Sequence, residues 1–264
     1  MTRRAYGFSL IELMIALVLG LLLLTGLYSV LGSNQLTYTA VNSSMRLTER
    51  GQQVLTLLRN QIQQAGFRNY TIVQGRTIFG DDATNGFSKD QIIYGLNALT
   101  SADRLANTDE IRLRFYGASV SSGSPATADN TIFDCTGEGI SQNATSAAPA
   151  VVKLYVSQNN ELMCWDSIHN AAQVMANNVE NLQFRYMTTT DTSFVNAASV
   201  AAGTWSNVTR IEFGFVLTES AAQGVVPGAI STFSLLGESY TTTNNKLRQP
   251  FSEVLFIRNQ GYIK

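Results

Sequence analysis

The sequence predicts an α+β protein in which one long N-terminal helix packs on an antiparallel β-sheet. From Phe8 to Leu31 the chain is an apolar run that carries a single charge, Glu12. Apolar residues then recur at helical spacing, and beyond residue 67 the periodicity changes to two. With 264 residues, the chain can form such a helix and a folded domain with its own core.

The apolar run, residues 8–32, is long enough to cross a bilayer as a helix of about 36 Å. Arg3 and Arg4 precede it, so the positive-inside rule leaves the N-terminus in the cytoplasm and the rest of the chain outside. Residues 1–7 form a short basic leader. Cleavage at Gly7-Phe8, where the apolar run begins, would keep the helix on the mature chain.

The apolar spacing in residues 33–66 predicts an amphipathic continuation of the same helix. Gly66 is a plausible stop, which gives a continuous helix of about 59 residues and roughly 88 Å. The apolar half contains no proline. The apolar positions that form the stripe are Leu36, Ala40, Leu47, Val54, Leu55, Leu58, Ile62 and Ala65.

Residues 67–264 predict a β-rich domain outside the cytoplasm. Its strand-like segments alternate apolar and polar residues, so each has one core face, and together they describe one antiparallel sheet. Long polar loops such as residues 117–130 and 188–204 separate them, and these either contact a partner or stay mobile. The segments read "DEIRLRFYG", "VVKLYV", "VENLQFRYM", "NVTRIEFGFVLT" and "SEVLFIRN".

Composition indicates an exported protein without a nucleic-acid-binding surface. Charged residues make up 14% of the chain and the net charge is −1, so no basic patch recruits nucleic acid directly. Cys135 and Cys164 are an even pair in a chain that leaves the cytoplasm, and each lies in a strand-like segment, "TIFDC" and "ELMCW", so a disulfide is the simplest expectation. It would contribute roughly 3 to 4 kcal/mol. Two buried free thiols are the alternative.

Residues for chemistry are scarce. His169 is the single histidine, and no nucleophile elbow accompanies it. Asp81 and Asp82 lack the spacing of a defined calcium loop and indicate a solvated turn. Asp109 and Glu110 begin a strand, and sequence does not reveal a carboxylate partner for either. We therefore expect no catalytic residue, no metal and no cofactor, and we do not expect an enzyme.

The stretch "GFSLIELMIALVLG" resembles the leader junction of the type IV pilin superfamily. The resemblance implies that a prepilin peptidase cuts after Gly7 and methylates the new amine of Phe8. It also implies a register role for Glu12, whose carboxylate would meet the N-terminal amine of a neighbouring subunit. A glutamate that reaches back to the membrane interface is the alternative.

The segments "NNVENLQFRY", "DEIRLRFY" and "LFIRNQ" look like the PilW family of minor pilins. That resemblance implies a pilin-like fold and a place in a tip complex that primes pilus assembly, with roles in twitching motility, adhesion and DNA uptake. The implied partners are other minor pilins, the major pilin and a tip adhesin. The implied location is the bacterial inner membrane and then the fibre.

Two other classes stay open from the sequence. One is a minor pseudopilin of a type II secretion system, of the GspJ kind. The other is a membrane-tethered periplasmic enzyme or binding module, which would require a deep pocket with clustered titratable groups.

Overall fold

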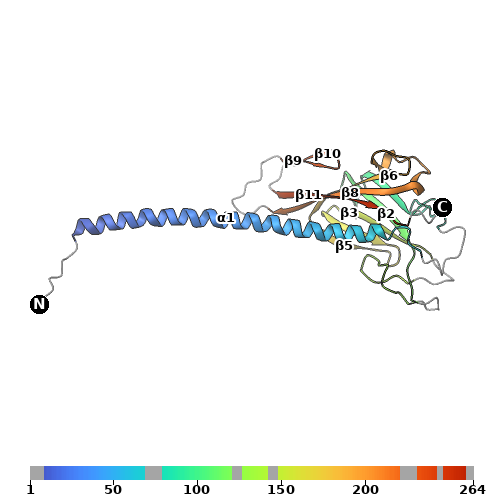
Figure 1. Cartoon of the computed structure of the whole chain (residues 1–264), viewed down its shortest axis with the longest axis horizontal. Helices are drawn as coiled ribbons and strands as arrows, with labels where there is room; N and C mark the ends of the chain where they lie inside the picture. The colour runs from blue at the N-terminus through green and yellow to red at the C-terminus, as the bar shows by residue number, and fades with distance from the viewer. Residues whose placement is uncertain are drawn as a thin grey trace.

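The computed structural model describes residues 9–68, 79–120, 127–141, 148–220, 231–242 and 246–259. One long helix extends from a β-rich domain and packs on that domain with its C-terminal half (Figure 1). The described fold is therefore α+β, with a helix on antiparallel sheets, as the sequence predicts.

Helix α1 spans Leu10–Gln63 and has 54 residues. All its buried positions lie from Ser43 onward, at spacings of one, three or four residues that form one face. It ends where Gly66 takes a φ of +73°, a left-handed conformation that glycine adopts without steric cost. The Gly66 N–H donates to the carbonyl of Arg114 at 2.9 Å, so the end of the helix is fixed to a strand.

The strands form two larger sheets and one hairpin, where the sequence predicts a single sheet. The five-stranded sheet has the order β1-β2-β3-β4-β5 and the four-stranded sheet has the order β11-β8-β6-β7, while β9 pairs only with β10. All pairs are antiparallel. The strands of the first sheet are β1 Ile93–Leu99, β2 Thr108–Phe115, β3 Ala150–Val156, β4 Glu161–Asp166 and β5 Ala171–Asn177. The others are β6 Val179–Thr188, β7 Val195–Asn196, β8 Val208–Ser220, β9 Ser231–Leu235, β10 Glu238–Thr242 and β11 Lys246–Phe256.

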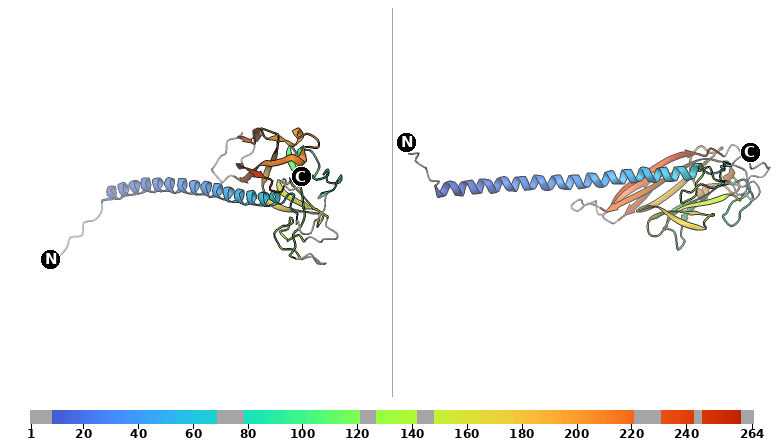
Figure 2. Two further views of the ribbon diagram at one scale, coloured as in Figure 1. Left: turned by 45° about the vertical axis from the view of Figure 1, so that its right-hand side comes forward. Right: turned by 90° about the horizontal axis from the view of Figure 1, so that it is seen from below.

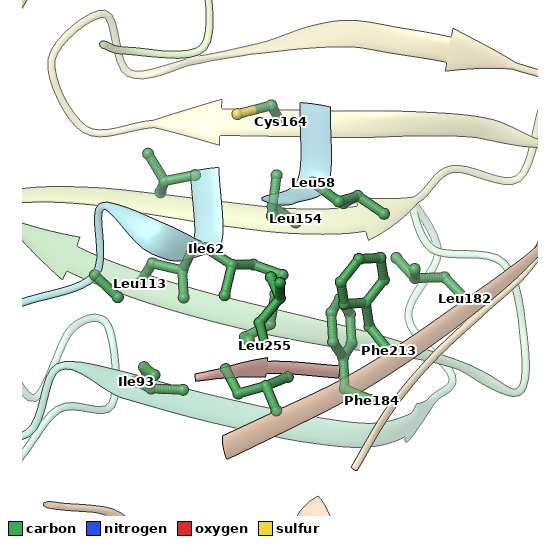
Figure 3. Close-up of a cluster of buried hydrophobic side chains, with 14 of the residues drawn as sticks. Leu58, Ile62, Ile93, Leu113, Leu154, Cys164, Leu182, Phe184, Phe213 and Leu255 are labelled. Carbon is green, nitrogen blue, oxygen red and sulfur yellow. The ribbon is translucent and has the colours of Figure 1, made fainter. Parts of the chain in front are cut away.

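The core lies between the two larger sheets and the C-terminal half of α1. Side chains from all three elements converge in it (Figure 3), for example Leu58 of α1, Leu154 of β3 and Phe213 of β8. These three are fully buried or nearly so. Because the inward faces of both sheets are apolar at alternate positions, the core needs both sheets and the helix to exclude water.

The helix packs closely on β11 at Gly51. A Cβ atom at this position would lie 2.0 Å from the ring of Phe251, so only glycine leaves room for that ring. Two ion pairs flank the contact, between Arg50 and Glu219 at 2.7 Å and between Arg59 and Glu253 at 2.8 Å. The C-terminal half of α1 is thus a structural part of the domain.

Three local details differ from the sequence-based expectation. Residues 131–135, "TIFDC", form no named strand, although the segment is strand-like in sequence; Phe133 makes an isolated bridge to Gly139. The polar segment 188–204 is folded and contains β7 and the short helix η1 Ala197–Ser199. Both faces of β2 are largely buried, so Arg114 is only 1% exposed rather than facing water.

Loop residues 79–92 cover the outer face of β2. The guanidinium of Arg114 donates to the carbonyls of Gly80 and Ser88, each at 2.6 Å, and to the carbonyl of Gln91. Phe79 and Phe87 lie against it. Burial lowers the pKa of Arg114 to about 10, which still leaves it charged at neutral pH. Arg114 therefore holds this loop on the sheet.

Candidate functional site

The N-terminal half of α1 is a long, exposed apolar surface. Every large apolar side chain between Leu10 and Val41 is exposed. By length and composition α1 can cross a membrane, and its most apolar stretch has no residue buried in the domain. Figure 2 shows this half extending away from the sheets in two further views. Exposed apolar area of this extent marks a surface that lipid or another protein covers.

Glu12 is the one charged residue in the exposed apolar half. It lies in the first turn of α1, where the unpaired N–H groups and the helix dipole favour a negative charge. Its backbone N–H donates to the carbonyl of Ser9 at 3.0 Å. Its side chain is exposed. The carboxylate is therefore open to a partner from outside the chain.

The predicted cleavage residues, Gly7 and Phe8, lie outside the described residues. Cleavage and methylation there stay predictions from the sequence. Ser9 and Leu10 begin the described part, so the helix starts within two residues of the predicted junction.

The two cysteines are joined. Cys135 and Cys164 form a disulfide with Cα atoms 5.6 Å apart. Cys164 lies in β4 and is fully buried. Cys135 lies in the loop of residues 127–141. The bridge thus attaches this loop to the five-stranded sheet.

His169 lies among carboxylates, of which Asp166 is three residues away and Asp134 and Glu138 are distant in the sequence. Its Nδ1 is 3.2 Å from Asp166 Oδ1 and 3.6 Å from Asp134 Oδ2. Possible ligand atoms of Asp134, Glu138 and His169 all lie within 4.8 Å of one another. Sequence spacing does not reveal this cluster, because loop and strand meet through the fold. The signal that could have found it is an acid within two positions of each cysteine, in "DC" and "CWDSIH".

The other acidic candidates take part in local structure. Asp81 accepts the N–H of Lys89 at 2.8 Å, and Asp82 accepts the side-chain amide of Asn85 at 2.8 Å. Both carboxylates therefore bind within their own turn. The carboxylate of Glu110 is 2.8 Å from Arg104 and 2.7 Å from Arg112.

Asp109 is a buried carboxylate without a charged partner among the described ion pairs. Burial raises its pKa to about 6, although the backbone N–H groups of Phe184 and Ala98 partly oppose this rise. Those two N–H groups use both of its oxygens, at 2.9 Å each. Asp109 therefore links its own strand, β2, to β1 and β6.

One hollow of about 380 Å³ lies between β6, β7 and the β9–β10 hairpin. Its charged lining residues are Arg185 and Glu238. Arg185 donates to the carbonyls of Leu236 and Phe194, at 3.0 Å and 2.9 Å. The lining contains no histidine and no cysteine.

Comparison with known proteins gives matches at both ends of the chain. Residues 2–28 match the family model described as the prokaryotic N-terminal methylation motif. Residues 140–259 match the model described as type IV pilus-assembly protein W. No curated protein sequence matches the chain.

Among solved structures, a type IV-like pilin from Thermus thermophilus is similar to the chain. The two share 13% sequence identity, with a TM-score of 0.42, and the match covers 81% of this chain and 98% of that one.

Proposed function

We propose that the chain is a PilW-like type IV pilin, as the matches of residues 2–28 and 140–259 support, and that it is a minor subunit of a tip complex that primes pilus assembly. In this proposal it first resides in the inner membrane, with its N-terminus in the cytoplasm. A prepilin peptidase then cuts after Gly7 and methylates Phe8. The match to a pilus-assembly family over residues 140–259 favours a pilus over a secretion pseudopilin.

One observation carries the proposal: α1 is a single helix with two different surfaces. Its C-terminal half is built into the core of the domain, while its N-terminal half is apolar and exposed. The same apolar surface can contact lipid before assembly and the helices of other subunits afterwards. Because the helix is continuous, its position in a bundle of helices fixes the position of the domain outside it.

Glu12 would set the depth at which the subunit joins. A charged carboxylate at the centre of a membrane costs about 2.5–3.5 kcal/mol on insertion scales, so a partner is needed there. The N-terminal amine of a neighbouring subunit can supply the opposite charge, and such a pair is strong where water is excluded. Only one depth brings the two groups together, so the pair selects the register.

The proposed partners are other minor pilins and the major pilin, through the N-terminal half of α1, and a tip adhesin through the outer domain. The processes would be twitching motility and adhesion, with DNA uptake through the fibre as a whole. The net charge of −1 supports a role that does not involve direct binding of nucleic acid by this subunit.

Substitution of Glu12 tests the register role. We expect Glu12→Ala and Glu12→Gln to lower the amount of this chain in sheared fibres by at least about tenfold, a change that corresponds to about 1.4 kcal/mol. Glutamine keeps the size but removes the charge, so similar losses in both variants identify the charge as the cause.

Label directed at the outer domain tests the tip position. It should mark the fibre ends rather than the length of the fibre.

Glu49→Gln is the matched control, because Glu49 is an exposed carboxylate on the same helix outside the apolar half. It should leave incorporation unchanged. The Tm of the outer domain should be the same in all variants. Normal incorporation of Glu12→Ala would overturn the register role, and label spread along the fibre would overturn the tip position.

A further inference from the structure

The cluster around His169 combines the ligand types that bind a divalent cation. It contains one imidazole and the carboxylates of Asp134 and Glu138, with possible ligand atoms within 4.8 Å of one another. A fourth group, the carboxylate of Asp166, contacts the same imidazole at 3.2 Å. Imidazole together with carboxylate is typical of zinc and similar transition-metal ions.

The disulfide brings the cluster together. Asp134 directly precedes Cys135, and Asp166 follows Cys164 by two positions at the end of β4. The turn between β4 and β5 carries His169 back over these acids. The loop is also attached to the end of α1, because the side-chain amide of Gln61 donates to the carbonyl of Asp134 at 3.1 Å. The positions of the cluster residues are therefore fixed by the disulfide and by the attachment of the loop to α1.

The carboxylates of Asp134 and Asp166 are buried. Together they carry two negative charges, and their described ion-pair partner, His169, can supply at most one positive charge. The side chains of Asp134 and Asp166 are 4% and 1% exposed, and within the described ranges their ion-pair contacts are with His169 alone. Buried carboxylates of this kind are costly unless a cation or hydrogen bonds compensate.

An unpartnered atom points to the same conclusion. One oxygen of Asp134 accepts the N–H groups of Thr136 and Glu138, at 2.7 Å and 3.0 Å. One oxygen of Asp166 accepts the N–H groups of Ile168 and His169, at 3.0 Å and 2.7 Å. The second oxygen of Asp166 is buried and has no hydrogen-bond partner. A cation bound beside His169 would compensate this charge.

We propose that Asp134, Glu138 and His169 form a binding site for a divalent cation of the zinc class. Asp166 acts as a positioning residue, because its contact with Nδ1 holds the imidazole ring in place. His169 and Glu138 are exposed, so a cation can enter from solvent. The bound ion would fasten the loop around Asp134 to the β4–β5 turn, next to the disulfide.

Thermal unfolding of the untagged full chain in detergent tests the site. The chain has one histidine, and its two cysteines are joined, so the protein offers zinc no competing imidazole or thiolate. After treatment with a chelator and its removal, added Zn²⁺ should raise the Tm by roughly 5 °C at about 100 times the dissociation constant. Bound zinc should reach one equivalent per chain.

Two variants identify the ligands, and a third tests the positioning role. His169→Ala and Glu138→Gln should each weaken zinc binding at least tenfold. Because both residues are exposed, we expect both variants to fold. Asp166→Asn should weaken it by roughly 10- to 100-fold, as is typical when the partner of a ligating imidazole is lost. In NMR spectra, zinc should shift the single imidazole signal of the wild type.

Glu49→Gln serves as the control, because it removes an exposed carboxylate remote from the cluster, and it should leave zinc binding unchanged. Three results would overturn the site: no change in Tm with Zn²⁺, a rise that persists in His169→Ala, or a response to Ca²⁺ without a response to Zn²⁺. None of these outcomes bears on Glu12 or on fibre assembly, so the two proposals fail separately.

Discussion

At the scale of single residues, Asp109 links the two larger sheets. It lies in β2 and accepts the N–H of Ala98 from β1 and the N–H of Phe184 from β6, each at 2.9 Å. The side chain is almost completely buried. Since its charge is not paired with a described cation, the link should depend on pH.

The direction of that dependence follows from the raised pKa, which is about 6 in the folded protein against 3.8 for the ordinary group. The folded state then binds the proton more tightly than the unfolded state. The contribution of Asp109 to the free energy of unfolding should therefore increase as pH falls below about 6, and should reach its full value only below 3.8. Between pH 7 and pH 5 we expect a gain of about 1 kcal/mol.

Unfolding of the wild type and of Asp109→Asn at pH 7 and pH 5 measures this gain. The difference in stability between the two should grow in favour of the wild type at pH 5. Asp103→Asn is a suitable control, because Asp103 is exposed and hydrogen bonding to Ser101 lowers its pKa. A difference between wild type and Asp109→Asn that is equal at both pH values would contradict the assignment.

At the scale of elements, the contact between α1 and β11 depends on the absence of a side chain at Gly51. We expect Gly51→Ala to lower the free energy of unfolding of the domain by about 1–3 kcal/mol, because the new methyl group would overlap the ring of Phe251. Urea unfolding followed by tryptophan fluorescence measures the change.

The same substitution at Gly32 is the matched control. Gly32 lies on the same helix and a Cβ atom there meets nothing within 4 Å. Gly32→Ala should leave domain stability unchanged. Combining Gly51→Ala with Phe251→Leu should recover part of the loss; full stability of Gly51→Ala alone would show that the ring moves aside at little cost.

The elements also show what sequence can and cannot predict. The helix and the cores of β2, β3, β6, β8 and β11 are predicted well, because alternation and helical spacing are local properties. The division into two sheets is not local: it depends on which strands pair across the chain. Residues 131–135 show the limit, since the segment is strand-like in sequence while Gln64 and the disulfide at Cys135 hold it in a loop.

The same distinction applies to the sites. Glu12 is visible in the sequence because one charge interrupts an apolar run. The cluster around His169 is not visible there, since Asp134 and Asp166 meet only after the disulfide and the β4–β5 turn have formed. The alternation in "DEIRLRFYG" predicts that Arg114 faces away from the core, and the covering loop of residues 79–92 explains its burial.

At the scale of the whole molecule, the mature chain has a predicted mass and N-terminus. Protein recovered from bacterial membranes or sheared fibres should begin at a methylated Phe8. Its mass should be two hydrogens below that of the reduced chain, because Cys135 and Cys164 are joined. Intact mass spectrometry with N-terminal sequencing measures both. A chain that still begins at Met1 would contradict the processing, and a mass equal to that of the reduced chain would contradict the bridge.

The continuity of α1 also has a mechanical consequence. A tensile force on the N-terminal half travels along the helix axis into the domain, where it meets the contacts of Arg50, Gly51 and Arg59 with β8 and β11. These contacts follow one another along the helix, so they are loaded in shear and together rather than opened one at a time. The outer domain can therefore bear a pull through its anchor without local peeling of the β-sheet.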